Sequence, residues 1–390
     1  MLAAPPALVF GEGVTGLAVL RSLGRNRVQA YVAGSCVDIV RSSRWFRPAP
    51  GDPLDETSHP EPVARYLREL PFERAVVIPC NDEWALAIAS LPGDVAESFP
   101  AALAPAEVLR LLVDKGLFAQ TAERLGVPTP RTIRVTGAAD LDALGEDELR
   151  RFFFKPRQSQ PFSERFGVKA LRLTSRAQAA QVLDEVEGHE VLLQEFIPGP
   201  PTGHLFLDGY VDRTGVMRAC LARRRLRLYP PDFGNSTMSV TIPMSEAQQA
   251  LESLRRLFDG IGYAGLFDAE FVHDDRDGSF KILEVNARPW WQLELAGASG
   301  LDLALMAYRD TLGLPLPEAG QYRVGRTWVH PIPDLRAWWA ARRSGEVLGG
   351  FPPRAWFRGA NALFSWDDPK PVAGEVARLA RRFVLRRGGA

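Results

Sequence analysis

Short hydrophobic runs alternate with helix-like segments over the first hundred residues. The first run ends at Gly11 and is followed by apolar positions at helical spacing. Strands are predicted at 7–10, 28–32 and 75–78, and helices at 17–23, 61–70 and 83–91. Strands that alternate with helices are typical of a parallel sheet covered on both faces. We therefore expect an α/β unit over residues 1–104.

A second unit begins near residue 105, where strands begin to follow one another directly. This order indicates an α+β unit with antiparallel strands. Two strands flank the polar, turn-rich stretch at 160–167, which predicts a hairpin with a mobile tip. Beyond residue 312, proline-rich connections lead to a helix-like stretch and a basic amphipathic tail at 376–387. Helices are predicted at 107–113, 115–125, 176–187, 245–259 and 335–343, and strands at 152–154, 168–173, 191–197, 204–211, 216–222, 264–273 and 279–286.

The composition excludes several classes of protein. The 390 residues include 47 Lys+Arg and 47 Asp+Glu, so the formal net charge is zero. Without a net basic field, the chain is not expected to bind nucleic acid or an anionic membrane surface. The three cysteines form no CxxC pair, which argues against a disulfide framework or a zinc site. The N-terminus has no basic segment before an apolar stretch, so we expect a cytoplasmic protein without membrane insertion.

Lysine is rare in this chain. Only five of the 47 basic residues are lysines, at 115, 155, 169, 281 and 370. Arginine replaces lysine at most solvated positions, so each remaining lysine is a candidate for a task that needs a compact ammonium group. Coding bias is the alternative explanation.

Residues Gly11–Gly16 match the GxGxxG pattern between a strand and a helix, as in a dinucleotide-binding turn. Such a site also needs an acidic residue about twenty positions later to bind a ribose hydroxyl. Here Tyr31-Val32 leads into Ala-Gly-Ser without an acid. A tight strand-to-helix turn is therefore the alternative to NAD binding.

Residues 264–288 carry the most specific pattern. The turn at 274–278 separates two alternating strands, and pairing that is symmetric about Asp277 would place Glu270 opposite Glu284. Directly opposed like charges are destabilising, so a cation is expected between them. Together with Asn286 they form an oxygen-only ligand set that suits Mg²⁺ or Mn²⁺. A solvated acidic face, or neutralisation by Arg288, is the alternative.

A nucleotide bound through that metal would need further cations at its phosphates. Lys155 ends one strand of the predicted hairpin and Lys169 lies on the next, so both ammonium groups could reach one cleft. Lys115 opens a helix and adds its charge to the amide donors there. No Walker or protein-kinase motif is present.

The order of these motifs resembles the ATP-grasp family. Lys115 opens a helix before Leu-Gly-Val-Pro-Thr-Pro, and Phe-Lys-Pro, Gln-Glu-Phe-Ile-Pro-Gly and Glu-Val-Asn-Ala-Arg follow in turn. The chain looks most similar to the carboxylate–amine ligases around D-aspartate ligase and the large subunit of carbamoyl-phosphate synthetase. The resemblance implies an α/β N-terminal pre-ATP-grasp domain, a two-subdomain α+β ATP-grasp fold and a short C-terminal extension. Their expected ranges are 1–104, 105–193, 194–312 and 313–390.

The resemblance also implies roles for individual residues. ATP would lie between the two subdomains, and the loop at 157–167 would close over its phosphates. Arg288 would steady the phosphoryl group or the acyl phosphate. The remaining assignments are Gln194 and Ile197 at the adenine with Glu195 nearby, His204 as a substitute ribose ligand, Lys115, Lys155 and Lys169 at the phosphates, and Glu270, Glu284 and Asn286 at Mg²⁺.

The implied reaction transfers the γ-phosphoryl group of ATP to a carboxylate, and an amine then attacks the acyl phosphate. The partners would be a small-molecule carboxylate and amine, with a homodimer possible. The run at 223–225, in particular Arg223 and Arg225, would help Arg288 to bind the carboxylate. A solvated basic run is the alternative for these arginines. An NAD-dependent oxidoreductase using Gly11–Gly16 and a non-catalytic nucleotide-binding protein are the alternative functions.

Overall fold

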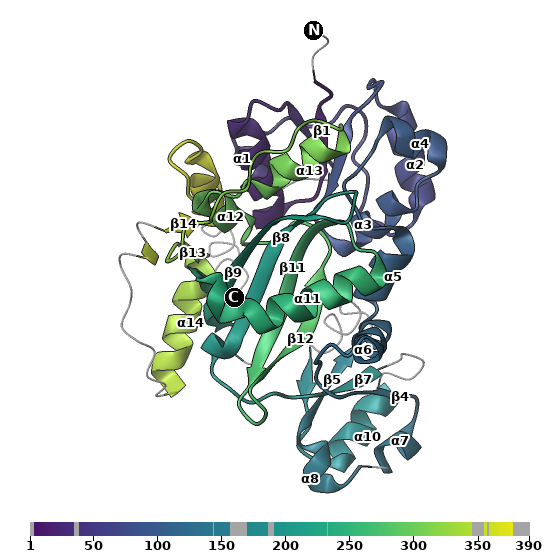
Figure 1. Cartoon of the computed structure of the whole chain (residues 1–390), viewed down its shortest axis with the longest axis vertical. Helices are drawn as coiled ribbons and strands as arrows, with labels where there is room; N and C mark the ends of the chain where they lie inside the picture. Colours follow the sequence, from purple (N-terminus) through teal and green to yellow (C-terminus); the bar gives the residue numbers. More distant parts are fainter. Residues whose placement is uncertain are drawn as a thin grey trace, which may run out of the picture.

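A computed structural model describes residues 4–34, 39–142, 144–156, 170–185, 191–231, 233–344, 355–356 and 359–376 (Figure 1). Four predicted features lie outside these ranges. They are Lys169, the hairpin tip at 160–167, the loop at 157–167 that is expected to close over the phosphates, and nearly all of the basic tail at 376–387. The described strands form three sheets. None of the described helices is long and apolar enough to cross a membrane.

The N-terminal residues form a small parallel sheet, as predicted. Its strand order is β2-β1-β3, and β1 pairs in parallel with both neighbours. Each strand is followed by helical structure, which is the α/β order expected from the sequence. The elements are β1 (Ala7–Phe10), α1 (Gly13–Arg25), β2 (Ala30–Ala33), η1 (Ile39–Ser42), α2 (Pro60–Glu69), β3 (Val76–Pro79), α3 (Asp82–Ala89) and α4 (Gly93–Ser98).

The largest sheet has seven strands in the order β12-β11-β8-β9-β10-β13-β14. Its pairs are antiparallel apart from β13 and β14, which come from the predicted C-terminal extension and pair in parallel. Helix α11 (Gln248–Ile261) packs its apolar side on one face of this sheet (Figure 1). The strands are β8 (His204–Val211), β9 (Met217–Tyr229), β10 (Asn235–Ile242), β11 (Gly265–Asp274), β12 (Ser279–Asn286), β13 (Thr327–Val329) and β14 (Ala360–Asn361).

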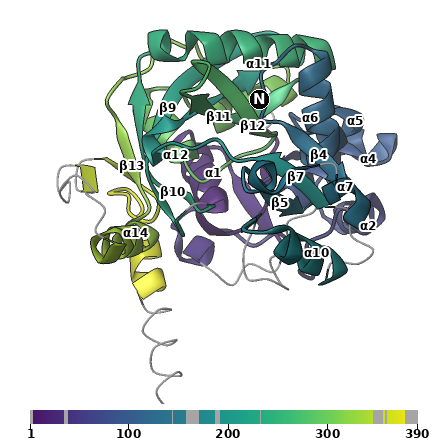
Figure 2. The ribbon, with the colours of Figure 1, turned by 90° about the horizontal axis from the view of Figure 1, so that it is seen from below.

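A four-stranded antiparallel sheet lies beside the edge strand β12, as both ribbon views show (Figures 1 and 2). Its order is β4-β7-β5-β6, and the pairing of β5 with β6 confirms the predicted hairpin. The predicted boundary between residues 193 and 194 falls inside β7. The elements are β4 (Thr132–Val135), α7 (Ala138–Asp142), α8 (Glu146–Leu149), β5 (Phe152–Pro156), β6 (Leu171–Arg172), α10 (Arg176–Glu185) and β7 (Val191–Glu195).

The remaining helices connect the sheets or cover their edges. Helices α5 (Ala106–Val113) and α6 (Lys115–Arg124) lie between the N-terminal unit and the four-stranded sheet. Asp114 caps α6 by accepting hydrogen bonds from Gly116 N and Leu117 N. The others are η2 (Pro201–Gly203), η3 (Met244–Ala247), α12 (Leu293–Ser299), α13 (Leu303–Thr311) and α14 (Pro331–Ser344).

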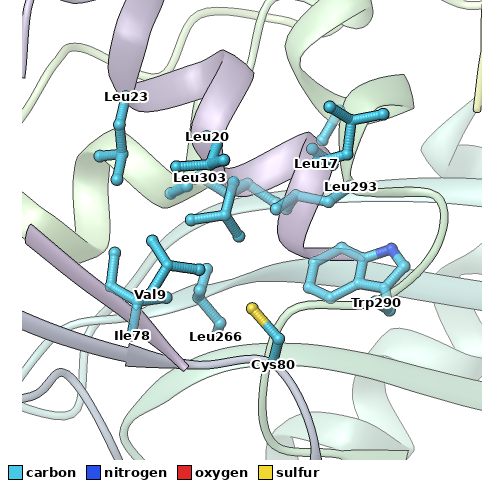
Figure 3. Close-up of a cluster of buried hydrophobic side chains, with 14 of the residues drawn as sticks. Val9, Leu17, Leu20, Leu23, Ile78, Cys80, Leu266, Trp290, Leu293 and Leu303 are labelled. Atoms are coloured by element: carbon cyan, nitrogen blue, oxygen red, sulfur yellow. The ribbon is translucent and has the colours of Figure 1, made fainter. Parts of the chain in front are cut away.

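One hydrophobic core joins the N-terminal sheet to the seven-stranded sheet (Figure 3). Val9 of β1 and Leu20 of α1 belong to the same buried cluster as Leu266 of β11, Trp290 and Leu303 of α13. Burial of each such side chain contributes about 1.5–3 kcal/mol to stability. The core therefore fixes the N-terminal unit against the strands that carry the candidate site.

A buried ion pair fastens the C-terminal segment to α1. Arg21 is fully buried, and its Nε lies 3.2 Å from Oδ2 of the equally buried Asp368. Arg21 Nη1 lies 3.1 Å from Glu294 Oε2 at the start of α12. Residues of the predicted C-terminal extension are thus part of the core and of the large sheet.

The burial of His330, directly after β13, should make the stability of the protein depend on pH. Its Nδ1 is buried without a hydrogen-bond partner in the described part of the chain. Burial lowers the pKa of His330 from 6.5 to about 4, against the opposing effects of Glu375 and Asp334. Between these values the unfolded chain binds more protons, so this contribution to stability is complete above pH 6.5 and falls as the pH drops towards 4.

We expect the wild-type protein to lose about 2 kcal/mol of unfolding free energy from this histidine between pH 7.5 and pH 5. Urea unfolding of His330→Gln should show a correspondingly smaller loss over that interval. The exposed His59 provides the control, since His59→Gln should keep the wild-type pH dependence. Parallel pH profiles for wild type and His330→Gln would contradict the assignment.

Candidate functional site

The β11–β12 hairpin brings the predicted metal ligands together. Glu270 pairs with Glu284 across the ladder, as predicted, and Asp268 pairs with Asn286. Close to the turn, however, the pairs are not symmetric about Asp277 as predicted. A bulge after Glu270 inserts the extra residue Leu283 into β12 and shifts the pairs near the turn by one residue. Cross-strand partners share a face, so all four side chains project from the face opposite α11.

Glu270 has two basic partners. Its Oε1 lies 2.8 Å from Arg225 Nη2 and 2.7 Å from His204 Nδ1. Burial raises the pKa of Glu270, but Arg225 and His204 outweigh that effect and hold it at about 2. The carboxylate is therefore charged at neutral pH. His204, expected near the ribose, lies against this candidate metal ligand.

Asn286 is oriented by hydrogen bonds at both ends of its amide. Its Nδ2 donates to Asp268 Oδ2 at 3.2 Å, and its Oδ1 accepts from Arg288 Nη2 at 3.1 Å. Glu284, two positions earlier, is half-buried and receives no hydrogen bond or ion pair within the described residues. Arg288 also donates from Nε to Asp82 Oδ1 at 2.9 Å.

The donor set at the hairpin fits a small divalent ion. No group of three or more His, Cys, Asp and Glu side chains that could bind a metal occurs among the residues the structure describes. The candidate set is smaller: the facing carboxylates of Glu270 and Glu284 and the amide oxygen of Asn286. Mg²⁺ is commonly bound by one or two carboxylates, with water and substrate phosphates completing its coordination. These oxygen ligands suit that mode of binding.

Three alternate arginines of β9 lie on the same polar side of the sheet, and each has a carboxylate partner. Arg223 is 1% exposed and lies 2.7 Å from both Asp208 Oδ2 and Asp268 Oδ1. Arg225 pairs with Glu270 and Ser236, and Arg227 pairs with Asp334 of α14.

The contacts of these arginines bear on their expected function. Arg223 and Arg225 have protein carboxylates as partners, so the expectation that they bind a substrate carboxylate finds no support in their placement. Arg224 points away and pairs with Glu246. The predicted strand at 216–222 also extends to Tyr229, because these carboxylates neutralise the arginines inside the sheet.

The four-stranded sheet presents two of the predicted nucleotide contacts, Lys155 and Gln194, on one face. Lys155 Nζ donates to Gln194 Oε1 at 3.2 Å, and Gln194 Nε2 donates to Thr132 Oγ1 at 3.2 Å. Leu192 pairs with Lys155 across the ladder and so shares its face. A Cβ atom placed on Gly116 would lie 3.7 Å from Leu192 Cδ2, which brings the start of α6, with Lys115, to this face.

Specific contacts join this sheet to the metal hairpin. Arg276, in the β11–β12 turn, lies 2.7 Å from Glu195 Oε1 at the end of β7. Ile282 of β12 donates its N–H to Pro128 O and accepts at its carbonyl from Thr129 Oγ1. The β11–β12 hairpin, which carries the predicted metal ligands, therefore lies against the sheet that carries the predicted adenine segment (Figure 2).

An aromatic cluster beside the adenine segment was not predicted from the sequence. The rings of Phe153 and Phe233 are 4.9 Å apart, and Phe196 lies edge-on to both. Phe196 directly precedes Ile197, whose N–H makes no backbone hydrogen bond within the described residues. The signal was available, because Phe196 is part of the Gln-Glu-Phe-Ile-Pro-Gly motif, but only the fold brings Phe233 to it.

Close packing explains the Gly11–Gly16 pattern. A Cβ on Gly11 would lie 2.3 Å from Cys80 Cβ, and one on Gly16 would lie 2.8 Å from Gly11 O. Both glycines thus allow the β1–α1 turn to pack tightly against the end of β3 and against itself. This supports the tight-turn alternative over a dinucleotide site.

Because Arg223 is buried, its substitution should lower the stability of the protein strongly. Arg223→Met would leave Asp208 and Asp268 buried without their cation, which should cost about 3–5 kcal/mol of unfolding free energy in urea titrations. The neighbouring Arg224→Met is the matched control, because it removes a partly exposed pair worth about 1 kcal/mol or less. Equal unfolding midpoints for the two variants would contradict a buried structural role for Arg223.

Comparison with known proteins agrees with the motifs. No family model matches the chain. The chain is 26% identical over 250 residues to the D-aspartate ligase of Enterococcus faecium. The match covers 61% of this chain and 59% of the relative. The chain thus spans about three-fifths of the length of that relative.

Solved structures extend the likeness over most of the chain. The carboxyaminoimidazole ribonucleotide synthase of Aspergillus clavatus, complexed with ATP, matches with a TM-score of 0.64 at 14% identity, over 84% of this chain and 81% of that one. The biotin carboxylase domain of the Hydrogenobacter thermophilus 2-oxoglutarate carboxylase, complexed with MgADP and bicarbonate, matches with a TM-score of 0.62 at 15% identity, over 82% and 73%. The chain therefore has the fold of the ATP-grasp enzymes and is a relative of D-aspartate ligase, as its motifs predicted.

Proposed function

We propose that the protein is an ATP-grasp carboxylate–amine ligase, which joins a small-molecule carboxylate to an amine and releases ADP and phosphate. The observation that carries this proposal is the pairing of Glu270 with Glu284, beside Asn286 and Arg288, on a hairpin that contacts the sheet of Lys155 and Gln194. The kinship with D-aspartate ligase supports an amino acid as one of the substrates.

In this proposal the four-stranded sheet binds the nucleotide. The backbone at Gln194 and Ile197 would contact adenine, with Glu195 fixed nearby by Arg276. Lys155 and Lys115 would meet the phosphates, because both approach one face of that sheet. Each ammonium group offsets part of the charge of the triphosphate.

Glu270, Glu284 and Asn286 would bind Mg²⁺ or Mn²⁺ together with the phosphate oxygens. The ion would supply charge neutralisation at the β- and γ-phosphates. Arg225 and His204 already share one oxygen of Glu270. The negative charge of Glu284 is therefore less neutralised by the protein, and Glu284 is the stronger candidate ligand. Asn286 would offer Oδ1, since Asp268 fixes the other end of its amide.

The reaction would proceed in two displacements. A carboxylate oxygen attacks the γ-phosphorus, and the bond from that phosphorus to the bridging oxygen breaks, so that ADP leaves. The lone pair of the amine then attacks the acyl carbon, the carbon–oxygen bond breaks with departure of phosphate, and the nitrogen loses a proton. Arg288, 19% exposed and permanently charged, would stabilise the negative charge on the transferring phosphoryl group. A homodimer stays a prediction.

Isotope transfer tests the acyl phosphate directly. With Mg-ATP and a pool of ¹⁸O-carboxylate amino acids, we expect ADP release that depends on the amino acids and one ¹⁸O atom in the released phosphate, measured by mass spectrometry. Release of AMP or unlabelled phosphate would contradict this route. ADP release that no carboxylate stimulates would favour the non-catalytic alternative, and binding of a nicotinamide cofactor without ATP turnover would favour the oxidoreductase.

Glu284→Gln tests the metal site. The substitution removes a charge from the ligand set but keeps its size, so we expect ADP formation to fall at least about 100-fold with little change in melting temperature. Glu246→Gln, on the opposite side of the sheet where Glu246 is 43% exposed, is the control and should keep the wild-type rate. Wild-type turnover in Glu284→Gln would remove the metal assignment.

A further inference from the structure

Asp82 of the N-terminal unit contacts Arg288 although 206 positions separate them. Arg288 Nε donates to Asp82 Oδ1 at 2.9 Å, and Nη2 lies 3.4 Å from Asp82 Oδ2. The two planar groups therefore meet in a two-point ion pair, a geometry that fixes the direction of the guanidinium as well as its distance. The carboxylate of Asp82 is one of the groups that raise the pKa of Arg288 against the effect of burial.

Asp82 is held by a rigid part of the fold. It is the first residue of α3, shortly after β3. The preceding Asn81 caps the helix by accepting a hydrogen bond from Trp84 N, and Asn81 Nδ2 donates to Glu56 Oε2. Trp84 is 3% exposed and packs in the core of the N-terminal unit. The carboxylate is thus presented from an anchored helix end.

Arg288 is held from the other side by the sheet that carries the metal ligands. Its Nη2 also donates to Asn286 Oδ1 at 3.1 Å, and its Nη1 donates to Pro289 O at 3.1 Å. Trp290, two positions later, is 2% exposed and donates from Nε1 to Asp208 Oδ2. The guanidinium therefore spans the gap between the N-terminal unit and the end of β12.

We propose that Asp82 is a positioning residue for Arg288, so that the N-terminal unit completes the phosphoryl-transfer site. This inference rests on the function proposed above. A guanidinium fixed before substrate binds loses no further rotational freedom in the transition state, and a misplacement of about 1 Å can cost about 100-fold in rate. Asp82 acts through Arg288 and does not itself contact the reacting atoms.

A double-mutant cycle of Asp82→Asn with Arg288→Lys tests this role, with rates of carboxylate-dependent ADP release as the readout. We expect Asp82→Asn to lower kcat about 10- to 100-fold, with less than about a threefold change in KM for ATP. In the Arg288→Lys background the same substitution should change kcat less than about twofold. Asp82→Glu, which keeps the carboxylate, should recover part of the loss.

Asp94→Asn is the control, because Asp94 forms an exposed pair with Arg68 in the same unit. It should keep the wild-type kcat. An equal loss from Asp82→Asn with and without Arg288, or a loss explained by a lower melting temperature, would show a merely structural contact and overturn the inference alone. A wild-type protein that releases no ADP with any carboxylate would overturn the proposed function and this inference together.

Discussion

The charges of three arginines on one face of β9 have to be balanced inside the protein, and much of the structure around the site follows from that requirement. Arg223, Arg225 and Arg227 receive their carboxylate partners from β8, β11 and α14. Loss of one partner from such a buried pair costs about 3–5 kcal/mol, so strands and helix must meet in one arrangement. Segments far apart in the chain are thereby held in register.

This constraint also shapes the candidate site. Glu270 is both the partner of Arg225 and one of the two facing carboxylates of the hairpin, so part of the repulsion between Glu270 and Glu284 is offset before any metal binds. Asp268 likewise links Arg223 to the amide of Asn286. The polar face of the sheet therefore forms one hydrogen-bonded network, in which structural and functional groups share partners.

Local sequence patterns predicted the elements that form through contacts between residues close together in the chain. The turn at 274–278 and the alternation on each side placed Glu270 opposite Glu284, although the bulge at Leu283 was invisible in the sequence. Strand β10 was missed because its inward residues, Ser236 and Ser239 among them, are small and polar and pack beside arginines. The contact of Asp82 with Arg288 depends on how two units dock, and no spacing in a single sequence reports that.

The salt bridge between Arg21 and Asp368 has a consequence for the order of assembly. During synthesis on a ribosome, α1 emerges early, but Asp368, one of the two carboxylates that compensate its buried cation, emerges almost 350 residues later. Until then Glu294 is the one carboxylate of this pair that the buried Arg21 can meet, so the nascent N-terminal layer should stay loosely closed. The segment around Asp368 would complete the closure of this layer only after translation has passed it.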